Sequence, residues 1–522
     1  MKLSPSRRAL ITCCLLPAVL GACADANPSA TPARPPLPSS TAGPTDAPGP
    51  SGGQVVESNP TGASANAAYQ PGPCTFREWL VNDTICGTLT VPEDHQQPGG
   101  RQIKLAVAIL KSSSDHPAPD PVVFLQGGPG LSVLTNRPEL TVPSFYPLLA
   151  SRDVILLEQR GVGLSQPALD CPEIDQVQAA DKGGPRDNTD PGPYLPAALA
   201  CRDRLAKAGV NLADYTTDQG AADVEALRQA LGYKEWNLFG ISYGTRLALT
   251  VMRDFPAGVR SAILDSPLPL QASISNRPRD VAAAFDTFFA ACAVDATCNR
   301  AYPDLKQVFN DTVDMLNKEP VQFSISQDHQ VGITGDMLMG ITFEALSIGP
   351  MITQMPRAIY AARKRDLTPL GRFVGSGSEG DALLFSVWCS EQVLPAGEEK
   401  LRAADSAYPQ LHHMFSQLDI LGICKQWGVP AVPTPEQQAV RSAIPTLILS
   451  GRFDPRTPPS NAGETARTLS NSHLFTFPGA GHAVSHDPCG MVLAAALVEN
   501  PAAAPTANCF ATLTGPAWDV GP

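Results

Sequence analysis

The chain has 522 residues, of which 43% are hydrophobic and 17% are charged. This composition is ordinary for a globular protein, and the length allows a large buried core in more than one compact unit. The formal net charge of −12 at pH 7 argues against a nucleic-acid-binding surface.

The first 22 residues have the pattern of an export signal. Three basic residues, Lys2, Arg7 and Arg8, precede a short apolar run over residues 9–20. The run is too short to span a bilayer, which distinguishes it from a transmembrane helix. We therefore predict a signal peptide over residues 1–22 and an exported protein.

The next segment predicts a lipid anchor and a tether. Leu20-Gly21-Ala22-Cys23 resembles the lipobox of bacterial lipoproteins, in which the cysteine becomes the lipidated first residue. Lipidation of Cys23 would attach the protein to a membrane in the cell envelope, whereas plain cleavage near Ala22 would secrete it. Residues 23–73 are rich in Pro, Ala, Ser, Gly and Thr, so they cannot pack a core, and we expect a disordered tether.

The cysteines that stay in the exported chain are even in number. Of the 13 cysteines, Cys13 and Cys14 leave with the signal peptide and Cys23 is modified, so ten remain. An even number in an exported protein favours disulfides. We predict pairing within five local couples: Cys74–Cys86, Cys171–Cys201, Cys292–Cys298, Cys389–Cys424 and Cys489–Cys509. No metal site is expected, because there is no C-x-x-C and the eight histidines do not group with the cysteines.

Strand and helix patterns alternate from residue 74 to residue 270. Strands are predicted over 85–91, 102–110, 121–125 and 154–157, in the apolar run that begins at Trp236, and over 261–264, with a helix over 217–231. This alternation is typical of a mostly parallel α/β sheet.

The alternation stops after about residue 270. Residues 271–440 are mostly helical in pattern, and buried strands resume at 445–450 and 473–477. We therefore predict a core over 74–270 and 441–522, with 271–440 inserted as a helical cap over the carboxyl edge of the sheet. An independent helical domain beside the sheet is the alternative.

One serine stands where a strand pattern meets a helix pattern. Residues 236–252 read W-N-L-F-G-I-S-Y-G-T-R-L-A-L-T-V-M, so that G-x-S-x-G lies between an apolar run and a helix-compatible run. This is the context of a nucleophile elbow. The flanking glycines let strand and helix approach closely while Ser242 takes a strained conformation. We predict that Ser242 is the nucleophile, at a helix N-terminus that stabilises an oxyanion.

A serine nucleophile needs an imidazole to accept its proton and a carboxylate to orient that imidazole. In hydrolases with such an elbow, the acid and then the histidine follow the serine, each after a late strand. Asp454 follows the strand at 445–450, and His482 follows the strand at 473–477. We predict a triad of Ser242, Asp454 and His482.

Two alternatives stay open. Asp265 also follows a strand pattern, and some hydrolases of this shape take their acid there. His486 lies close to His482 but a further turn from the strand end.

The Gly127-Gly128-Pro129-Gly130 loop follows an early central strand, where one donor of an oxyanion hole is found. We assign the two backbone N–H donors to Gly128 and Tyr243. A phosphate-binding loop is not favoured, because no G-K-[ST] follows the glycines. No cofactor is implied, because the triad supplies both nucleophile and proton transfer.

Five spaced motifs carry a family resemblance over residues 74–522. They are Q-G-G-P-G, E-Q-R-G-V-G-L-S, G-I-S-Y-G-T-R, G-R-F-D-P-R-T-P and G-A-G-H. Together they resemble the proline iminopeptidase and tripeptidyl aminopeptidase branch of the α/β-hydrolases. The resemblance implies an α/β-hydrolase fold, with a mostly parallel sheet, helices on both faces and an inserted helical cap. The family often has H-G-G-P-G and D-Q-R-G, where this chain has Gln126 and Glu158; neither belongs to the predicted triad.

The resemblance also implies a serine exopeptidase that releases residues or short peptides from free N-termini. A carboxylate of the cap recognises the substrate amine in the iminopeptidase relatives, and Glu391, beside Cys389, is the best match here. An exposed helix acid is the alternative for Glu391. Thr457, three residues after Asp454, is expected to hydrogen-bond near the triad, and Arg160 to be a buried structural arginine.

We therefore expect a lipid-anchored serine aminopeptidase outside the cytoplasm, acting on peptides and not on nucleic acid. An esterase or lipase with the same triad is the second hypothesis, and a surface binding protein that retains the fold is a third, which the intact triad disfavours. The sequence carries no signal for the oligomeric state, the number of residues released or a preference for proline.

Overall fold

A computed structural model of the chain describes residues 67–74, 83–136, 142–180, 194–324, 330–373, 381–411 and 420–521. All of them belong to one compact unit, Asn59–Pro522. The predicted signal peptide, Cys23 and the tether up to residue 66 lie outside the described residues. In the described part of the chain, no helix is both long and apolar enough to cross a bilayer.

The centre of the unit is a nine-stranded sheet with the order β1-β2-β3-β5-β4-β6-β7-β10-β11. Its strands are β1 (Ala68–Gly72), β2 (Thr84–Pro92), β3 (Gln102–Leu110), β4 (Val122–Leu125), β5 (Val154–Leu157), β6 (Trp236–Ile241), β7 (Val259–Asp265), β10 (Thr446–Gly451) and β11 (Ser472–Phe477). The pairs from β1 to β5 are antiparallel, and all pairs from β5 onward are parallel. This confirms the mostly parallel sheet, because continuous apolar runs such as those of β4, β5 and β6 are buried on both faces.

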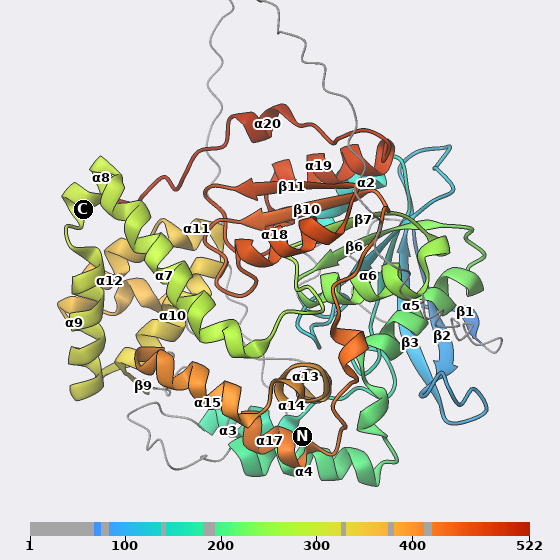
Figure 1. The fold of residues 1–522 in the computed structure, drawn as a ribbon, viewed down its shortest axis with the longest axis horizontal. Coiled ribbons are helices and arrows are strands. Elements are labelled where there is room, and N and C mark those ends of the chain that lie inside the picture. Colours follow the sequence, from blue (N-terminus) through green and yellow to red (C-terminus); the bar gives the residue numbers. More distant parts are fainter. Residues whose placement is uncertain are drawn as a thin grey trace, which may run out of the picture. The chain divides into compact units, whose positions relative to one another are not determined.

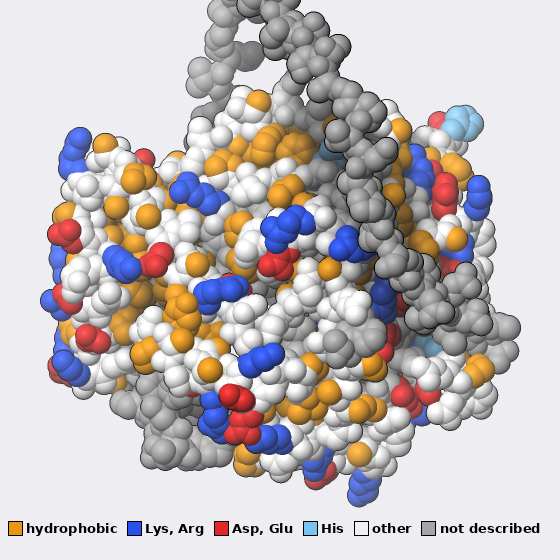
Figure 2. Space-filling model, in the orientation of Figure 1, with side chains coloured by type: hydrophobic (Ala, Val, Ile, Leu, Met, Phe, Trp, Pro, Cys, Tyr) orange, Lys and Arg blue, Asp and Glu red, His pale blue; other side chains and the backbone are white. Residues whose placement is uncertain are grey.

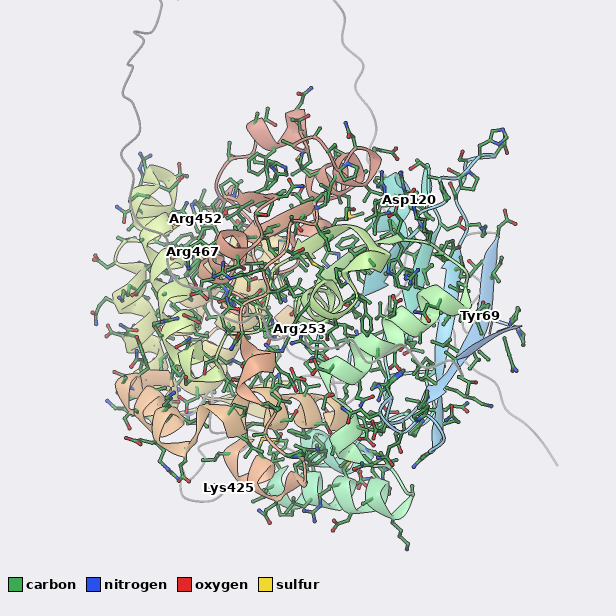
Figure 3. The ribbon with its side chains drawn as sticks, turned by 45° about the vertical axis from the view of Figure 1, so that its right-hand side comes forward. Tyr69, Asp120, Arg253, Lys425, Arg452 and Arg467 are labelled. Atoms are coloured by element: carbon green, nitrogen blue, oxygen red, sulfur yellow. A yellow bond between two sulfur atoms is a disulfide. The ribbon has the colours of Figure 1, made fainter. Side chains whose placement is uncertain are left out.

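The edge strand β1 corrects the predicted tether, which was expected to extend to residue 73. Ala68–Gly72 pairs with β2 in antiparallel register. The side chain of Tyr69 lies over Gly87, where an added Cβ would meet its ring atoms at 2.5 Å, and Figure 3 labels Tyr69 at this edge. This packing, the ladder hydrogen bonds and the disulfide from Cys74 to Cys86 in β2 hold a segment that is otherwise rich in Pro and Gly. Pro71 is tolerated because the strand is at the edge.

Helices cover both faces of the sheet (Figure 1). On one face, α5 (Thr217–Ala230), α6 (Tyr243–Asp254) and α18 (Pro459–Thr468) contribute to one hydrophobic cluster with the strands. On the other face, α2 (Tyr146–Leu149) and α19 (Pro488–Glu499) pack in a second cluster, and α20 (Asn508–Ala511) joins its margin. These two layers bury the apolar sides of the strands and hold their carboxyl ends in one row.

The described residues between β7 and β10, within the segment 271–440 that was predicted to be a helical cap, are largely helical. The helices are α7 (Arg277–Val294), α8 (Ala296–Ala301), α9 (Leu305–Lys318), α10 (Gly335–Ser347), α11 (Gly349–Ile352), α12 (Met355–Arg363), α13 (Asp381–Trp388), α14 (Leu394–Ala396), α15 (Glu398–Ala407) and α17 (Ile420–Trp427). A π-helical turn spans Cys389–Val393. A short antiparallel pair, β8 (Val321–Ser324) and β9 (Gln330–Ile333), was not predicted.

The cap has two hydrophobic clusters. The helices α7 to α12 form one of them, and they lie side by side in Figure 1. The second cluster joins α13 and α17 to α3 (Pro172–Ala180) and α4 (Tyr194–Lys207), which precede the nucleophile in the chain. Part of the cap layer therefore comes from the segment that was assigned to the core.

On the face in Figure 2, cationic and anionic side chains are interspersed, with hydrophobic ones scattered among them.

All five predicted disulfides are present in the predicted pairings: Cys74–Cys86, Cys171–Cys201, Cys292–Cys298, Cys389–Cys424 and Cys489–Cys509. Their Cα–Cα distances lie between 4.9 and 5.8 Å, within the range for unstrained bridges. Several disulfides in one chain are typical of proteins that fold outside the reducing cytoplasm.

Arg160 is the buried structural arginine that the sequence predicts. It is 1% exposed, and its Nε and Nη2 each donate to the carboxylate of Asp223 at 2.7 Å. Its Nη1 donates to the backbone oxygens of Glu93 and Asp214 at 2.6 Å. His95 contacts the same Asp223 carboxylate at 2.7 Å. The network fixes the loop after β5 to α5.

We expect Arg160→Ala to lower the free energy of unfolding by about 3–5 kcal/mol, because it leaves the buried carboxylate of Asp223 without its bidentate partner. Urea unfolding followed by circular dichroism measures this. Arg402→Ala, which removes an exposed ion pair with Glu398 on α15, is the matched control and should leave the midpoint unchanged. An equal, small effect of both substitutions would contradict a structural role for Arg160.

Candidate active site

Ser242 lies at a sharp turn between β6 and α6. Its backbone has φ 57° and ψ −123°, a strained conformation for a residue with a side chain. A Cβ added at Gly244 would lie 1.9 Å from the backbone oxygen of Leu125, and one at Gly240 would lie 2.3 Å from that of Gly244. Both positions must therefore be glycine for α6 to approach β4 and β6. The geometry is that of the predicted nucleophile elbow.

The predicted acid and base meet at the carboxyl ends of β10 and β11. His482 Nδ1 lies 2.7 Å from Asp454 Oδ2, and the Asp454 side chain is fully buried. Burial alone would raise the pKa of Asp454, but the charge of His482 and hydrogen bonds from His482 and Thr457 outweigh it, so the pKa lies below its usual value. The carboxylate is thus ionised at neutral pH and can orient the imidazole.

Thr457 bridges the acid and the histidine. Its hydroxyl donates to Asp454 Oδ2 at 2.8 Å and lies 3.1 Å from His482 Nδ1. Its backbone N–H donates to Asp454 Oδ1 at 3.0 Å. Thr457 thus lies where the sequence places it, beside Asp454 and His482, which we call the dyad. It hydrogen-bonds to both carboxylate oxygens of Asp454.

The two alternatives occupy other positions. The carboxylate of Asp265 accepts hydrogen bonds from the backbone N–H groups of Val484 at 2.9 Å and Ser485 at 2.7 Å, and burial raises its pKa. Asp265 therefore supports the loop that follows His482, while Asp454 contacts the imidazole itself. His486 is exposed on that loop.

The glycine-rich loop lies directly against Ser242. A Cβ added at Gly127 would lie 3.0 Å from Ser242 Cβ and 3.5 Å from Ser242 Oγ. Gly128 follows with φ 111° and is exposed, so its backbone can be reached by a substrate. Tyr243 is the first residue of α6, where backbone N–H groups have no partner within the helix. Gly128 and Tyr243 stay our predicted oxyanion-hole donors.

Glu391 lies in the π-helical turn and reaches the nucleophile helix. Its Oε2 accepts from Arg246 Nε at 2.7 Å and from the Thr217 hydroxyl at 2.8 Å, while its Oε1 accepts from the Thr217 backbone N–H at 2.8 Å. The ion pair with Arg246 is almost fully buried. Glu391 is therefore not the exposed helix acid of the alternative interpretation.

The space beside Glu391 is small. A cavity lined by Glu391, Arg246, Thr217 and Glu436, among others, has a volume of about 10 Å³, room for about one water molecule. Burial and the neighbouring Asp218 raise the pKa of Glu436 to about 8. A substrate ammonium at Glu391 would have to share the carboxylate with Arg246 and enlarge this cavity.

Two contributors to the site were not predicted. Arg246 belongs to the quoted motif G-I-S-Y-G-T-R, so its buried partner could have been sought among the cap acids. Ser347, at the end of α10, accepts a hydrogen bond from the His482 backbone N–H through its own carbonyl oxygen. A backbone acceptor carries no side-chain signal in the sequence. Among the described residues, no three His, Cys, Asp or Glu are grouped to hold a metal ion.

The chain is similar to known proteins over most of its length. Residues 120–302 match the family described as "alpha/beta hydrolase fold", and residues 412–508 match the family described as "TAP-like protein". "Serine protease Hip1" of Mycobacterium tuberculosis is 27% identical over 479 residues, covering 83% of this chain and 86% of that protein. "Tripeptidyl aminopeptidase" of Streptomyces coelicolor is 26% identical over 445 residues, covering 80% of each.

An esterase name also occurs among the relatives. "Carboxylesterase B" of M. tuberculosis is 28% identical over 442 residues, covering 78% of this chain and 82% of that protein. Among solved structures, a proline iminopeptidase of Mycobacterium smegmatis matches with a TM-score of 0.39 and 16% identity, over 79% of this chain and 98% of that one. The sheet order, the elbow turn and the family matches lead to one conclusion: the chain has the α/β-hydrolase fold and is a serine hydrolase with relatives that are named as peptidases.

Proposed function

We propose that the protein is a serine aminopeptidase that releases short peptides from free N-termini through an acyl-enzyme on Ser242. The observation that carries the proposal is the strained elbow of Ser242 in the same fold as the 2.7 Å contact between His482 and Asp454. Nucleophile, orienting acid and base follow one another along the chain in the order that serine hydrolases of this fold use.

The proposed reaction has two halves. Ser242 Oγ attacks the scissile carbonyl carbon while its proton passes to His482 Nε2, and Asp454 stabilises the resulting imidazolium through Nδ1. The backbone N–H groups of Gly128 and Tyr243 bind the oxyanion. The imidazolium then protonates the leaving amine, the C–N bond breaks, and a water molecule deprotonated by His482 hydrolyses the acyl-enzyme.

The names of the relatives favour a peptidase over an esterase. Two of the similar proteins are named as a serine protease and a tripeptidyl aminopeptidase, and one is named as a carboxylesterase. The C-terminal match to the TAP-like family also favours the aminopeptidase. An esterase with the same triad is the second candidate.

Two further parts of the proposal concern the amine and the membrane. Glu391 is proposed to recognise the substrate amine, provided that the ammonium shares its carboxylate with Arg246.

Lipidation at Cys23 is proposed to hold the enzyme at the membrane, outside the cytoplasm, in agreement with its five disulfides. Mass spectrometry of the purified N-terminal peptide tests the lipid, because an unmodified N-terminus would identify a secreted form.

The reaction class is tested with a panel of free-amine aminoacyl and tripeptidyl anilides, their N-blocked counterparts, and short acyl esters. We expect the wild type to hydrolyse only the free-amine peptides, and Ser242→Ala to lose at least about 10³-fold in kcat. Hydrolysis of esters alone would keep the triad and assign the protein to the esterases. Turnover that survives in Ser242→Ala would show that another residue is the nucleophile.

The role of Glu391 is tested by Glu391→Gln on the same panel. A carboxylate that binds the ammonium predicts that KM for free-amine substrates rises about 10- to 100-fold. Glu398→Gln, on the exposed part of α15, is the control. A loss of thermal stability with unchanged KM would instead assign Glu391 to holding the cap on α6.

The role of Thr457 is tested by Thr457→Val, which removes the hydroxyl between Asp454 and His482 and keeps the shape. We expect kcat to fall about 10-fold, because the imidazole loses part of its orientation, while KM stays near its wild-type value. Thr457→Ser retains the hydroxyl and should restore most of the rate. Equal rates in both variants would show that the hydroxyl does not act on the dyad.

A further inference from the structure

We propose that the C-terminal end of the cap helix α10 positions both loops of the catalytic dyad, with Ser347 and Arg456 as the positioning residues. The inference rests on the proposed function, since it concerns the residues to which that function assigns catalysis. It adds that the cap is a structural part of the catalytic apparatus as well as a cover over it.

The loop that carries His482 is held from two sides. Four consecutive backbone N–H groups, those of residues 482–485, all have acceptors. The core supplies three of them: the Ser266 hydroxyl for residue 483 at 2.9 Å, and the two oxygens of Asp265 for residues 484 and 485. The fourth, the N–H of His482 itself, donates to the carbonyl oxygen of Ser347 at 2.9 Å. Of these four backbone contacts, the one made by His482 itself therefore comes from the cap.

Close packing reinforces this contact. A Cβ added at Gly481 would lie 2.0 Å from the backbone oxygen of Leu346, and 2.9 Å from the carbonyl carbon of Ser347. All of these atoms are backbone, so no side-chain rotation can make room. The histidine loop and the end of α10 touch so closely that any displacement of one must move the other.

The loop that carries Asp454 is attached to the same helix end through Arg456. The backbone N–H of Arg456 donates to Asp454 Oδ1 at 2.8 Å. Its side chain turns to α10, where Nε donates to the Ser347 hydroxyl at 3.0 Å, the guanidinium pairs with Glu344, and its carbon lies 4.8 Å from the centre of the Phe343 ring. Ser347 thus contacts the acid loop with its hydroxyl and the histidine loop with its carbonyl group.

These contacts matter more for position than for stability. The side chains of Arg456 and Glu344 are 36% and 45% exposed, and exposed ion pairs add little to folding. A shift of about 1 Å in a catalytic group, in contrast, costs on the order of 10²-fold in rate. Losing Arg456 should therefore leave the protein folded and slow the reaction.

The test is the rate at which a small alkyl fluorophosphonate labels Ser242 in the full-length protein, because this probe reports the activated serine and makes no use of a peptide site. We expect Arg456→Ala to lower the second-order labelling rate about 10- to 100-fold, with an unchanged melting temperature and a weakened low-field proton NMR signal from the His482–Asp454 contact. Arg456→Lys, which keeps the charge toward Glu344, should restore part of the rate. Arg402→Ala, which loses an exposed ion pair elsewhere on the cap, should label at the wild-type rate.

Two glycine-to-alanine substitutions, one at the contact and one away from it, test the close packing independently. Gly481→Ala forces the histidine loop and α10 apart and should slow labelling by a similar factor. Gly340→Ala lies within α10 itself, with nothing within 4 Å of the added methyl group, and should leave the rate unchanged.

The outcomes separate this inference from the proposed function. Wild-type labelling at Ser242 with unchanged rates in Arg456→Ala and Gly481→Ala would overturn the role of α10 and leave the proposed function in place. A peptide KM that rises in Arg456→Ala while labelling is unchanged would also overturn it, because Arg456 would then bind substrate. A wild type that is not labelled at Ser242 would overturn the proposed function and this inference with it.

Discussion

The structure depends on how closely α6 approaches the strands beneath it. The backbone of Gly244 lies against the carbonyl oxygen of Leu125, and Gly240 against the carbonyl oxygen of Gly244, with no room for a side-chain carbon at either position. This contact forces the turn at Ser242 into a positive φ, and it brings the start of α6 beside the glycine-rich loop after β4. The serine, the loop that covers it and the first N–H of the helix are thus placed by one packing constraint.

The cap is joined to this centre by two contacts of opposite character. The Glu391–Arg246 pair is buried, with three hydrogen bonds on one carboxylate, and removing one partner of such a pair is costly. The Arg456–Glu344 contact on α10 is half exposed. The first contact attaches the cap to α6. The second joins the cap to the loop that carries Asp454.

Much of the fold could be predicted because the core strands are buried on both faces. Such strands read as continuous apolar runs, and the bounds of β5 agree with those expected. The bounds of β3 also agree, but there the signal is the alternation of buried and exposed residues at its start. The edge strand β1 could not be predicted, since its order comes from pairing and from Tyr69 packing on Gly87. The β8–β9 pair has strands of four residues, too short for a period-two pattern to stand out. The packing of α3 and α4 against the cap is a tertiary contact between segments far apart in the chain, so no local sequence pattern predicts it.

The site follows the same division. Ser242, Asp454 and His482 could be proposed from the sequence because each stands in a recognisable motif after a strand pattern, and the three follow in a fixed order. The surroundings of Glu391 could not, because its partners come from α5 and α6, far away in the chain. The role of Ser347 could not be predicted from the sequence, because its contact to the histidine loop uses a backbone oxygen, which every residue has.

The support around His482 bears on the choice between amide and ester substrates. An amine is a poor leaving group until it is protonated, so His482 must act as an acid after it has acted as a base, and in amide hydrolysis its position matters in both steps. An ester with a good leaving group makes a smaller demand on the second step. A histidine loop whose successive N–H groups are bound by Asp265 and Ser266 from the core, and by Ser347 from the cap, holds the imidazole steady between the two steps. The proposed peptidase reaction therefore makes the larger demand on this support.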